Sequence, residues 1–298
     1  MAAEVMRWDV FPSDNSNAHV RRWLIGQLDS FVQREAAQVA DAMIRMLDDR
    51  SRAVLDAVDR RFSEAELNRL AGWLERIRLG EPLQYVLGST DFCGLRLACS
   101  AAALIPRPET EELVGWALEQ AGADCTRVLD VGTGTGCIAL ALKAARPHWS
   151  VTAWDVSEAA LELAVENGRT TGLNVDWQRV DLLADPVSDS WDLICSNPPY
   201  IPERERERMA RHVVDHEPGL ALFVPDEDPL VFYTALSELA LKSLNDGGSL
   251  IAECHFEKAE EVANCWRKMG WEVHIRVDMQ GAPRAVCACM KSTHGESI

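Results

Sequence analysis

The apolar residues between positions 18 and 78 recur at helical spacing. Steps of three and four residues separate the apolar side chains within 23–31 and again within 40–47, as expected for the buried face of a helix. Ser63 and Glu66 form a Ser-x-x-Glu pattern, which is typical of a capping box at the start of a helix. Because no strand pattern interrupts this stretch, we predict a small bundle of roughly four helices.

The pattern changes at residues 80–82, where Gly and Pro break the helical spacing. Residues 83–87 resemble a short strand and residues 95–97 alternate apolar and polar side chains, which predicts a hairpin-like linker. The prolines within 105–108 end this segment. Residues 109–119 then open with acidic side chains directly after a proline, and this order favours a helix start because acids suit the helix dipole there.

From residue 126 onward, predicted strands alternate with predicted helices. The strands are expected at residues 127–131, 151–154, 175–180, 191–195, 249–253, 271–277 and 285–290. The helices are expected at residues 136–145, 157–169, 230–244 and 256–269. This alternation is typical of an α/β fold with an open, mostly parallel sheet and helices on both faces.

The charge of the chain limits the classes of partner. With 298 residues, of which 47% are apolar, the chain can form one large domain and a smaller one. Its formal net charge is −17, whereas a protein that binds nucleic acid through phosphates usually presents a basic face. Residues 17–80 are close to neutral, with 11 Arg against 10 Asp and Glu. We therefore expect no stable nucleic-acid binding, and any binding face for an acidic partner is expected on the N-terminal segment.

The cysteines and histidines do not indicate a metal site. The nine cysteines contain no Cys-x-x-Cys pair, and His212, His216 and His255 lack metal-ligand spacing. We expect reduced thiols in a cytoplasmic protein. Residues 1–17 contain acids and a proline without an apolar run, which does not fit a signal peptide. No stretch is long and apolar enough to predict a membrane-spanning helix.

Residues 128–136 read Val-Leu-Asp-Val-Gly-Thr-Gly-Thr-Gly and predict a buried strand that passes through a glycine-rich turn into a helix. Glycines let the backbone approach a ligand closely, and the pattern alone fits NAD, a nucleotide or a plain tight turn. The spacing Gly132-x-Gly134-x-Gly136 differs from that of dinucleotide sites. Asp130 lies near the strand end, where its carboxylate can reach a ligand's amino group. A positively charged ligand without a pyrophosphate, such as S-adenosyl-L-methionine, suits this acidic turn better than NAD.

Two further acidic positions follow the next predicted strands. Asp155 lies 19 residues after Gly136, at a position where an acid typically binds the ribose hydroxyls of an adenosine ligand. Asp181 and Leu182 follow the third strand, where they can meet the edge and face of an adenine. Each acid alone also fits a surface helix cap or turn. Together with the glycine turn, these residues predict a site for an adenosine cofactor.

The sequence Ser196-Asn197-Pro198-Pro199-Tyr200 follows the fourth predicted strand. In an open parallel sheet, ligands bind beyond the carboxyl ends of the strands, near the point where the strand order reverses. The two prolines remove two donors, so neighbouring carbonyls stay free to accept, as does the side-chain oxygen of Asn197. Two converging acceptors can hold an NH2 group by both hydrogens, and Tyr200 offers a flat face to a planar amide or base.

This arrangement addresses the weak nucleophilicity of a planar nitrogen. The lone pair of an amide or exocyclic amine is delocalised, and accepting its N–H bonds raises the electron density on nitrogen and orients the lone pair. A sulfonium cofactor is already activated, so the protein supplies mainly positioning and electrostatics. The motif predicts methyl transfer from S-adenosyl-L-methionine to a planar nitrogen, and by itself it does not distinguish an amide from an adenine.

Several segments between residues 75 and 290 together resemble one enzyme family. They are Gly-Glu-Pro-Leu-Gln-Tyr-Val-Leu-Gly at 80–88 with Phe92 and Gly94, Leu-Ile-Pro-Arg-Pro-Glu-Thr-Glu at 104–111, the glycine segment at 128–140, Asn-Pro-Pro-Tyr at 197–200, Glu217-Pro218 with Ala221-Leu222, and Gly281 with Arg284. This combination resembles the HemK/PrmC family of release factor glutamine methyltransferases. Asn-Pro-Pro-Tyr alone is shared with adenine-N6 methyltransferases, and the 104–111 segment makes the resemblance more specific.

The resemblance implies a Rossmann-like class I methyltransferase fold. This fold has a sheet of seven strands, the last of them antiparallel, behind a small N-terminal helical bundle. We divide the chain into a flexible tail at 1–16, a helical substrate-recognition domain at 17–79, a linker with a short hairpin at 80–108 and an S-adenosylmethionine-dependent methyltransferase domain at 109–298. We expect a cytoplasmic monomer without membrane association, whose partners are peptide-chain release factors and whose product acts in translation termination.

The resemblance also implies the acceptor and the roles of individual residues. The acceptor is the side-chain amide nitrogen of the glutamine in the Gly-Gly-Gln motif of release factors, and the product is N5-methylglutamine. The implied catalytic residues are Asn197, Pro198 and Tyr200. The implied cofactor-binding residues are Asp130, Gly132, Thr133, Gly134, Thr135, Gly136, Asp155, Asp181, Leu182 and Asn197. The implied substrate-binding residues are Asn197, Pro198, Pro199, Tyr200, Phe92 and Arg107.

Other functions stay open on the sequence alone. A glutamine methyltransferase of a ribosomal protein would use the same chemistry. An adenine-N6 nucleic-acid methyltransferase would share the catalytic motif, but the charge of −17 and the lack of a basic target-recognition region argue against it. The intact Asn-Pro-Pro-Tyr motif argues against a module that only senses the cofactor. The chain departs from the family at His216, where an aromatic is expected, and residues 1–75 show only a general helical likeness.

Overall fold

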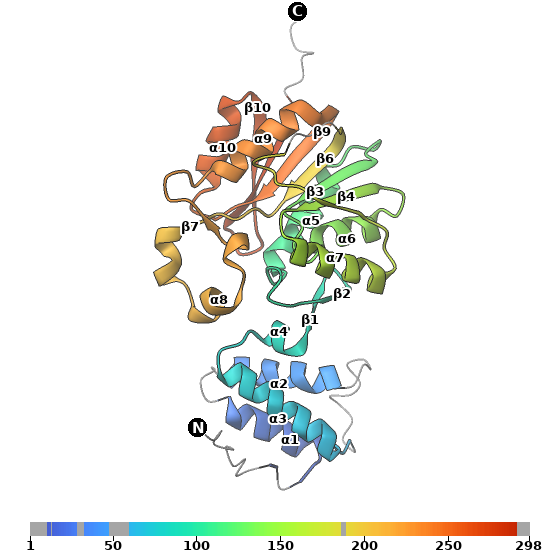
Figure 1. Ribbon diagram of the computed structural model, residues 1–298, viewed down its shortest axis with the longest axis vertical. Coiled ribbons are helices and arrows are strands. Elements are labelled where there is room, and N and C mark those ends of the chain that lie inside the picture. Colours follow the sequence, from blue (N-terminus) through green and yellow to red (C-terminus); the bar gives the residue numbers. More distant parts are fainter. Residues whose placement is uncertain (1–10, 13, 29–32, 48–59, 186–188, 291–298) are drawn as a thin grey trace, which may run out of the picture. The chain divides into compact units, whose positions relative to one another are not determined.

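Two compact units make up the chain in this computed structural model, one formed by Met1–Leu87 and the other by Gly88–Ile298 (Figure 1). The structure describes residues 11–12, 14–28, 33–47, 60–185 and 189–290. The tail predicted at 1–16 therefore lies mostly outside the described residues. The boundary between the units falls inside the predicted linker at 80–108, and the division of the chain into four functional parts stays a prediction.

The first unit is helical, as the spacing of its apolar residues predicts. Its helices are α1 (Asn17–Gln27), α2 (Gln33–Leu47), α3 (Glu64–Arg78) and the short α4 (Leu83–Leu87). Their buried faces share one core, which includes Val20, Leu24, Met43, Leu70 and Leu74. Helix α3 begins with the predicted capping box, because the Ser63 hydroxyl accepts from the Glu66 amide and the Glu66 carboxylate accepts from the Ser63 amide.

Residues 83–87 form helix α4, so the strand predicted for them is wrong. The carbonyl of Pro82 accepts hydrogen bonds from two backbone amides of this helix, both at 3.0 Å, and the fixed φ of proline favours a first helical turn. The predicted hairpin begins afterwards as antiparallel β1 (Ser89–Phe92) and β2 (Leu95–Ala98). Gly94 in its tight turn has a φ of 78°, a left-handed value that such a turn requires.

Seven strands form the sheet of the second unit, in the order β10-β11-β9-β6-β3-β4-β5. They are β3 (Arg127–Val131), β4 (Ser150–Asp155), β5 (Asp176–Arg179), β6 (Trp191–Ser196), β9 (Leu244–Glu253), β10 (Trp271–Val277) and β11 (Pro283–Met290). Strands β3, β4, β5, β6 and β9 pair in parallel, and β11 is antiparallel to both of its neighbours. The predicted fold class, a Rossmann-like sheet with the last strand antiparallel, is confirmed.

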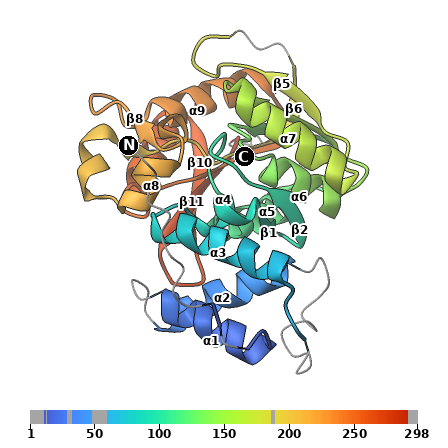
Figure 2. The same ribbon diagram turned by 60° about the horizontal axis from the view of Figure 1, so that its bottom comes forward.

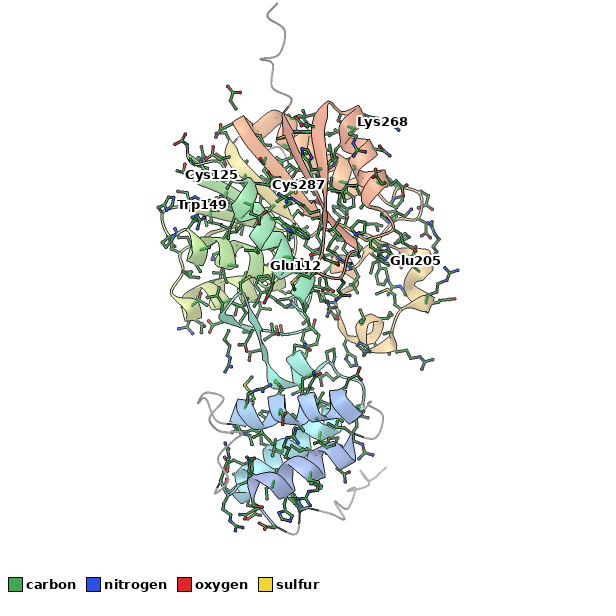
Figure 3. All side chains as sticks on the ribbon, turned by 180° about the vertical axis from the view of Figure 1, so that it is seen from behind. Glu112, Cys125, Trp149, Glu205, Lys268 and Cys287 are labelled. Carbon is green, nitrogen blue, oxygen red and sulfur yellow. The ribbon has the colours of Figure 1, made fainter. Side chains whose placement is uncertain are left out.

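Helices cover both faces of this sheet (Figures 1 and 2). On one face lie α5 (Pro108–Gln120), α6 (Cys137–Ala145) and α7 (Glu158–Thr171). On the other lie α9 (Val231–Ser243) and α10 (Ala259–Lys268). Side chains alternate between the two cores, so Val128 of β3 packs on the α5–α6 side and Leu129 on the α9–α10 side. Cys125 and Cys287 belong to the α5–α6 core (Figure 3).

The chain between β6 and α9 folds into short elements. They are β7 (Ile201–Pro202), the 3-10 helix η2 (Glu203–Arg208), α8 (Arg211–His216), the 3-10 helix η3 (Gly219–Ala221) and β8 (Phe223–Val224). Strands β7 and β8 pair in parallel, which ties the two ends of this segment together. The guanidinium of Arg206 lies 3.9 Å from the centre of the Phe223 ring and packs across the segment. Within the described residues, no helix is long and apolar enough to cross a membrane.

Candidate active site

The glycine turn between β3 and α6 forms one wall of a cavity at the carboxyl ends of the parallel strands. Gly132, Gly134 and Gly136 have φ angles of 73°, 56° and 81°, which glycine adopts without strain. The amide of Gly132 donates to the carbonyl of Trp154 at 2.9 Å and holds the turn against β4. A Cβ on Gly136 would lie 2.8 Å from the Trp177 ring, so the third glycine serves close packing behind the wall.

Asp130 lies fully buried beneath this turn and does not line the cavity. Its Oδ2 accepts from the Thr133 hydroxyl at 2.6 Å and from the Ala139 amide at 3.2 Å. Burial raises the pKa of Asp130 to about 7. Its Oδ1 has no hydrogen-bond partner among the described residues, which is uncommon for a buried polar atom. Asp130 therefore fixes the turn and the start of α6.

The acids predicted for the cofactor come together from the ends of two strands. Asp155 ends β4, and its carboxylate accepts from the Gly134 amide at 2.8 Å and from the Ser157 amide at 2.9 Å. Burial raises the pKa of Asp155. Asp181 and Leu182, which follow β5, line the same cavity as Asp155. The cavity wall thus presents two carboxylates next to the glycine turn.

The segment after β6 forms another part of the wall, with the residues Asn197, Pro198 and Pro199. Ser196 ends β6, is buried, and donates through Oγ to the carbonyl of Val131 at 2.8 Å. This bond fixes the start of the segment to the neighbouring strand β3. The side-chain amide nitrogen of Asn197 donates to the hydroxyl of Thr110 at 3.2 Å. The predicted catalytic segment and the predicted cofactor turn therefore share one cavity.

Two predicted substrate contacts, Tyr200 and Phe92, lie outside the part of the cavity wall that the described residues form. Tyr200 packs against the core beside α9 and α10, with its ring centre 6.2 Å from that of His255. Burial raises the pKa of the Tyr200 hydroxyl. Phe92 is 1% exposed and packs in the core that includes Leu113 of α5. Phe92 occupies a core position and Tyr200 is partly buried against the core, and the contact of both with substrate stays a prediction.

Arg107 lines the cavity and is paired with a buried acid. Its Nη2 lies 2.5 Å from Oε1 of Glu217, whose side chain is 1% exposed. The other oxygen of Glu217 accepts from the amide of Ile105 at 3.2 Å. A buried carboxylate is tolerated when it is paired and hydrogen-bonded, so Glu217 fixes the residues that precede α5. The sequence marked Glu217 through the family likeness but did not indicate its partner.

Sequence reasoning did not single out several residues of the cavity. Thr110 belongs to the 104–111 segment, and its presence in the wall could have been suspected from that likeness. Leu220 and Phe232 also line the cavity, and no chemical motif marks them. The cavity contains about 1090 Å³ of empty space, counted out to its open mouth.

The chemistry of the wall favours one class of ligand. A pyrophosphate at a helix start is held by free backbone amides, whereas the Gly134 amide already donates to Asp155. Asp155 and Asp181 suit a ligand with hydroxyl or amino donors, and Arg107 is the single cationic side chain among the described lining residues. The described residues contain no cluster of His, Cys, Asp and Glu that could hold a metal ion. The wall fits an uncharged or positively charged ligand with hydroxyl groups.

Comparison with known protein families and structures points to methyltransferases. A family model described as Methyltransferase small domain matches residues 113–218. Among solved structures, the hMettl16 catalytic domain in complex with MAT2A 3′UTR hairpin 1 is similar, with a TM-score of 0.54 and 18% identity over 78% of this chain and 83% of that chain. At this level of identity, the structural likeness shows the fold alone.

Curated relatives share much more of the sequence. The release factor glutamine methyltransferase of Bacteroides thetaiotaomicron is 44% identical over 64% of this chain and 69% of that protein. The relative of the same name from Lactococcus lactis subsp. lactis is 36% identical over 78% of this chain and 86% of that protein. The one from Deinococcus radiodurans is 44% identical over 72% of this chain and 77% of that protein.

The residues present in the cavity fit S-adenosyl-L-methionine, which is the methyl donor of this enzyme. The carboxylates of Asp155 and Asp181, which line the cavity, suit its amino and hydroxyl groups. The left-handed Gly132 and Gly134 add no side chains of their own to the cavity wall, so a ligand can approach the backbone of the turn there. When bound, the cofactor supplies a sulfonium methyl group that a nitrogen can take up directly. The chain is an S-adenosylmethionine-dependent methyltransferase and belongs to the release factor glutamine methyltransferase family.

Proposed function

We propose that this enzyme methylates the side-chain amide nitrogen of the glutamine in the Gly-Gly-Gln loop of peptide-chain release factors, giving N5-methylglutamine. One observation carries the proposal: residues 197–199 and the glycine turn line the same cavity. An amide held at Asn197 therefore lies beside the methyl donor. The names of the relatives that are 36–44% identical support the choice of a release factor as the acceptor.

Asn197 and Pro198 hold the acceptor amide in this proposal. The side-chain oxygen of Asn197 and the backbone carbonyl of Pro198 accept the two N–H bonds of the glutamine NH2 group. Accepting both bonds raises the electron density on the nitrogen and orients its lone pair toward the methyl group. The nitrogen would take the methyl group from the sulfonium sulfur and lose one of its two protons to solvent, which leaves a neutral secondary amide. The fixed φ angles of Pro198 and Pro199 keep the carbonyl in place while the acceptor enters.

The cofactor is held from the other side of the cavity. Asp155 accepts from ribose hydroxyls, and Asp181 with Leu182 meets the adenine. Gly132 and Gly134 leave room for the ligand against the backbone, which the positive φ of both residues supports. Thr133, Thr135 and Gly136 shape the same turn, and Asp130 supports it from below.

Arg107 binds the polypeptide next to the acceptor glutamine in this proposal. Glu217 engages one of its nitrogens, and a guanidinium has five N–H donors, so further donors face the cavity. These donors suit backbone carbonyls of an extended loop such as Gly-Gly-Gln. Tyr200, which packs against one core, then supports the catalytic segment, and Phe92, which lies in the other core, supports α5.

The N-terminal unit provides recognition of the release factor in this proposal. Residues 17–80 are close to neutral in a chain of net charge −17, with 11 Arg against 10 Asp and Glu. Such a segment repels an acidic protein surface less than the rest of the chain does. We further propose that the enzyme is a monomer and acts in the cytoplasm, where release factors meet the ribosome.

The decisive experiment offers three acceptors in parallel to the full-length enzyme with methyl-labelled S-adenosyl-L-methionine. The acceptors are a release factor, a ribosomal protein mixture and double-stranded DNA. We expect label in the release factor, and we expect mass spectrometry to place one methyl group on the glutamine of its Gly-Gly-Gln peptide. A release factor with that glutamine changed to Ala is the matched control and takes up no label.

Each of the other outcomes contradicts the proposal in a distinct way. Label in a ribosomal protein alone indicates the same amide chemistry on a different substrate. Label in DNA indicates adenine-N6 methylation, which the net charge of −17 makes unfavourable because DNA phosphates repel an acidic surface. Label in the glutamine-to-Ala release factor shows that the enzyme modifies another position.

A further inference from the structure

One partly buried polar side chain of the cavity wall and two buried ones form a continuous chain of hydrogen bonds. The amide nitrogen of Asn197 donates to the hydroxyl of Thr110 at 3.2 Å, and that hydroxyl donates to Oε2 of Glu253 at 2.7 Å. Thr110 and Glu253 are each 2% exposed. The two bonds join residues that are 87 and 143 positions apart in the sequence. Such a chain between distant buried residues constrains the orientation of each member.

The fold brings these three residues together from three elements. Asn197 directly follows β6, and Glu253 ends the neighbouring strand β9, where Ser196 is paired with Ala252. Thr110 lies in the first turn of α5, which Pro108 begins. The proline at the helix start therefore sets the position at which the Thr110 hydroxyl meets both strand ends.

The chemistry of Glu253 determines the direction of every hydrogen bond in this chain. An ionised carboxylate can only accept, so the single proton of the Thr110 hydroxyl is directed to Glu253. The hydroxyl oxygen can then only accept from its other neighbour, which must be the NH2 end of the Asn197 amide. The carbonyl end of Asn197 is left free of that contact. No hydrogen bond from the described residues occupies its Oδ1.

We propose that Thr110 and Glu253 are positioning residues, which hold the Asn197 amide so that its Oδ1 accepts from the substrate NH2 group. This inference rests on the proposed role of Asn197 as the acceptor of the glutamine amide. An unrestrained Asn side chain can rotate by half a turn and present its NH2 group instead. In that orientation two donors face each other, and the substrate amide is repelled.

The same chain predicts a response to pH. A protonated Glu253 can donate to Thr110, and the hydroxyl can then donate to Oδ1 of Asn197, which reverses the direction of both bonds. Burial raises the pKa of Glu253 to about 7, and the Thr110 hydrogen bond and Arg284 oppose this shift. The other charged or titratable groups that interact with Glu253 are Arg107, Glu109, Tyr200, Tyr233, Cys254 and Cys137.

The tyrosines and cysteines in this set do not titrate near neutral pH, because burial raises the pKa of each of them. Glu253 is therefore the member whose ionisation changes the direction of the chain. We expect kcat on a release factor to rise with pH through about 7 as Glu253 loses its proton. Asp130 has a similar pKa, so the assignment to Glu253 needs a variant.

Thr110→Val and Thr110→Ser are a matched pair that tests the hydroxyl. Valine keeps the shape and removes the hydroxyl, and serine keeps the hydroxyl and removes a methyl group. We expect Thr110→Val to lower kcat by about 10- to 100-fold, as misplacement of a reacting group does, with unchanged affinity for S-adenosyl-L-methionine by calorimetry. Thr110→Ser is expected to restore most of kcat. Thr234→Val on α9, whose partly buried hydroxyl contacts Cys265, is the control for the loss of a Thr hydroxyl away from this chain of hydrogen bonds.

Near-wild-type kcat in Thr110→Val overturns the inference, and so does an equal loss in Thr110→Ser. If Thr110→Val fails to fold, as judged by calorimetry and thermal unfolding, Glu253→Gln provides the test. Glutamine can either donate or accept, so it does not fix the direction of the chain. We expect this variant to keep cofactor affinity and to lose the rise of kcat near pH 7. A Glu253→Gln profile that matches the wild type overturns the inference.

Asn197→Ala separates this inference from the proposed function. A release factor that is methylated at the wild-type rate by Asn197→Ala contradicts the catalytic role of Asn197 itself. If Asn197→Ala is inactive while Thr110→Val is active, the proposed function stands and the positioning role fails. We also expect Thr110→Val to cause no additional loss in the Asn197→Ala background, because its effect is transmitted through Asn197. A further loss there shows that Thr110 acts elsewhere.

Discussion

The guanidinium of Arg107 lies 2.5 Å from the carboxylate of Glu217, which follows it by 110 positions in the chain. The Glu217 side chain is 1% exposed and the Arg107 side chain is 34% exposed. One end of this pair is therefore fixed in the protein interior while the other reaches the cavity. The pair joins the start of α5 to the segment between β6 and α9, so it links two parts of the cavity wall.

Replacing Glu217 with Ala is expected to lower both stability and substrate affinity. The change leaves the Ile105 amide without its acceptor and frees Arg107 to turn toward solvent. We expect the free energy of unfolding to fall by about 2 kcal/mol, and KM for the release factor to rise more than kcat falls. Urea unfolding and steady-state kinetics measure the two effects. Glu203→Ala removes an exposed partner of Arg206 and should cost less than about 1 kcal/mol.

Asn197→Ala is expected to abolish methyl transfer without loss of cofactor binding. The variant removes an acceptor that is used when the amide nitrogen becomes nucleophilic, and one such group contributes about 3 kcal/mol or more. We expect kcat to fall by at least about 100-fold. Calorimetry with S-adenosyl-L-methionine should give an affinity within a factor of about three of the wild type. Near-wild-type turnover would exclude Asn197 from the reaction.

Asp155→Ala is expected to affect the cofactor and not the chemical step. The variant removes the carboxylate proposed for the ribose hydroxyls and leaves the Gly134 amide without its acceptor. Loss of charged hydrogen bonds of this kind costs about 1.5–3 kcal/mol each, so affinity for S-adenosyl-L-methionine should fall by at least about 10-fold. Asp176→Ala at the opposite end of a parallel strand is the control. Equal affinity in Asp155→Ala and the wild type would contradict the ribose assignment.

The strands, the glycine turn and the place of the segment after β6 in the cavity wall could be predicted because each is encoded by neighbouring residues. The alternation of apolar positions marks a buried strand such as β3, and the Ser63–Glu66 pattern marks a helix start directly. Helix α4 could not be predicted from its five residues alone, since its first turn depends on the carbonyl of Pro82. Short apolar segments do not by themselves distinguish a strand from a helix.

The contacts that orient the site could not be read from the sequence. Thr110 and Glu253 are 143 positions apart, and only the pairing of β6 with β9 brings them to the same place. Glu253 ends an apolar strand, as Asp155 does, and this shared position is the one sequence signal for its importance. The directions of Phe92 and Tyr200 likewise depend on how the hairpin and the loop pack, which no local pattern specifies.

Asp130 is expected to make the protein less stable as pH rises toward neutrality. Burial raises its pKa to about 7 in the folded protein, compared with an ordinary value of 3.8. At a pH between these two pKa values, Asp130 keeps a proton in the folded protein that it has lost in the unfolded chain. The stability that this proton contributes is therefore lost as pH rises through the pKa of the folded protein. Asn at this position carries no such proton.

Urea unfolding of the cofactor-free wild type and of Asp130→Asn at about pH 5, 6 and 7 measures this contribution. We expect the free energy of unfolding of the wild type to fall relative to that of Asp130→Asn across this range. Glu253, whose pKa is also raised to about 7, is present in both proteins, so the difference isolates Asp130. Parallel pH profiles of the two proteins would contradict a raised pKa at Asp130.

Gly136 and Gly132 are expected to respond differently to the same substitution. Both have positive φ, 81° and 73°, so alanine costs roughly 1–2 kcal/mol in backbone strain at either position. A Cβ at Gly136 also lies 2.8 Å from the Trp177 ring and 3.2 Å from Ala164, whereas a Cβ at Gly132 meets no atom within 4 Å. Overpacking of a close contact adds about 1–3 kcal/mol at Gly136.

Gly136→Ala should therefore lower the free energy of unfolding by more than Gly132→Ala does, as measured by urea unfolding without cofactor. Gly132 lines the cavity and Gly136 does not, so the order reverses for ligand binding. We expect Gly132→Ala to weaken binding of S-adenosyl-L-methionine more than Gly136→Ala does, because its methyl group projects into space that the folded chain leaves open. If both variants lost stability and affinity in the same proportion, Gly132 and Gly136 would serve the same purpose. The assignment of Gly136 to close packing and of Gly132 to ligand contact would then be wrong.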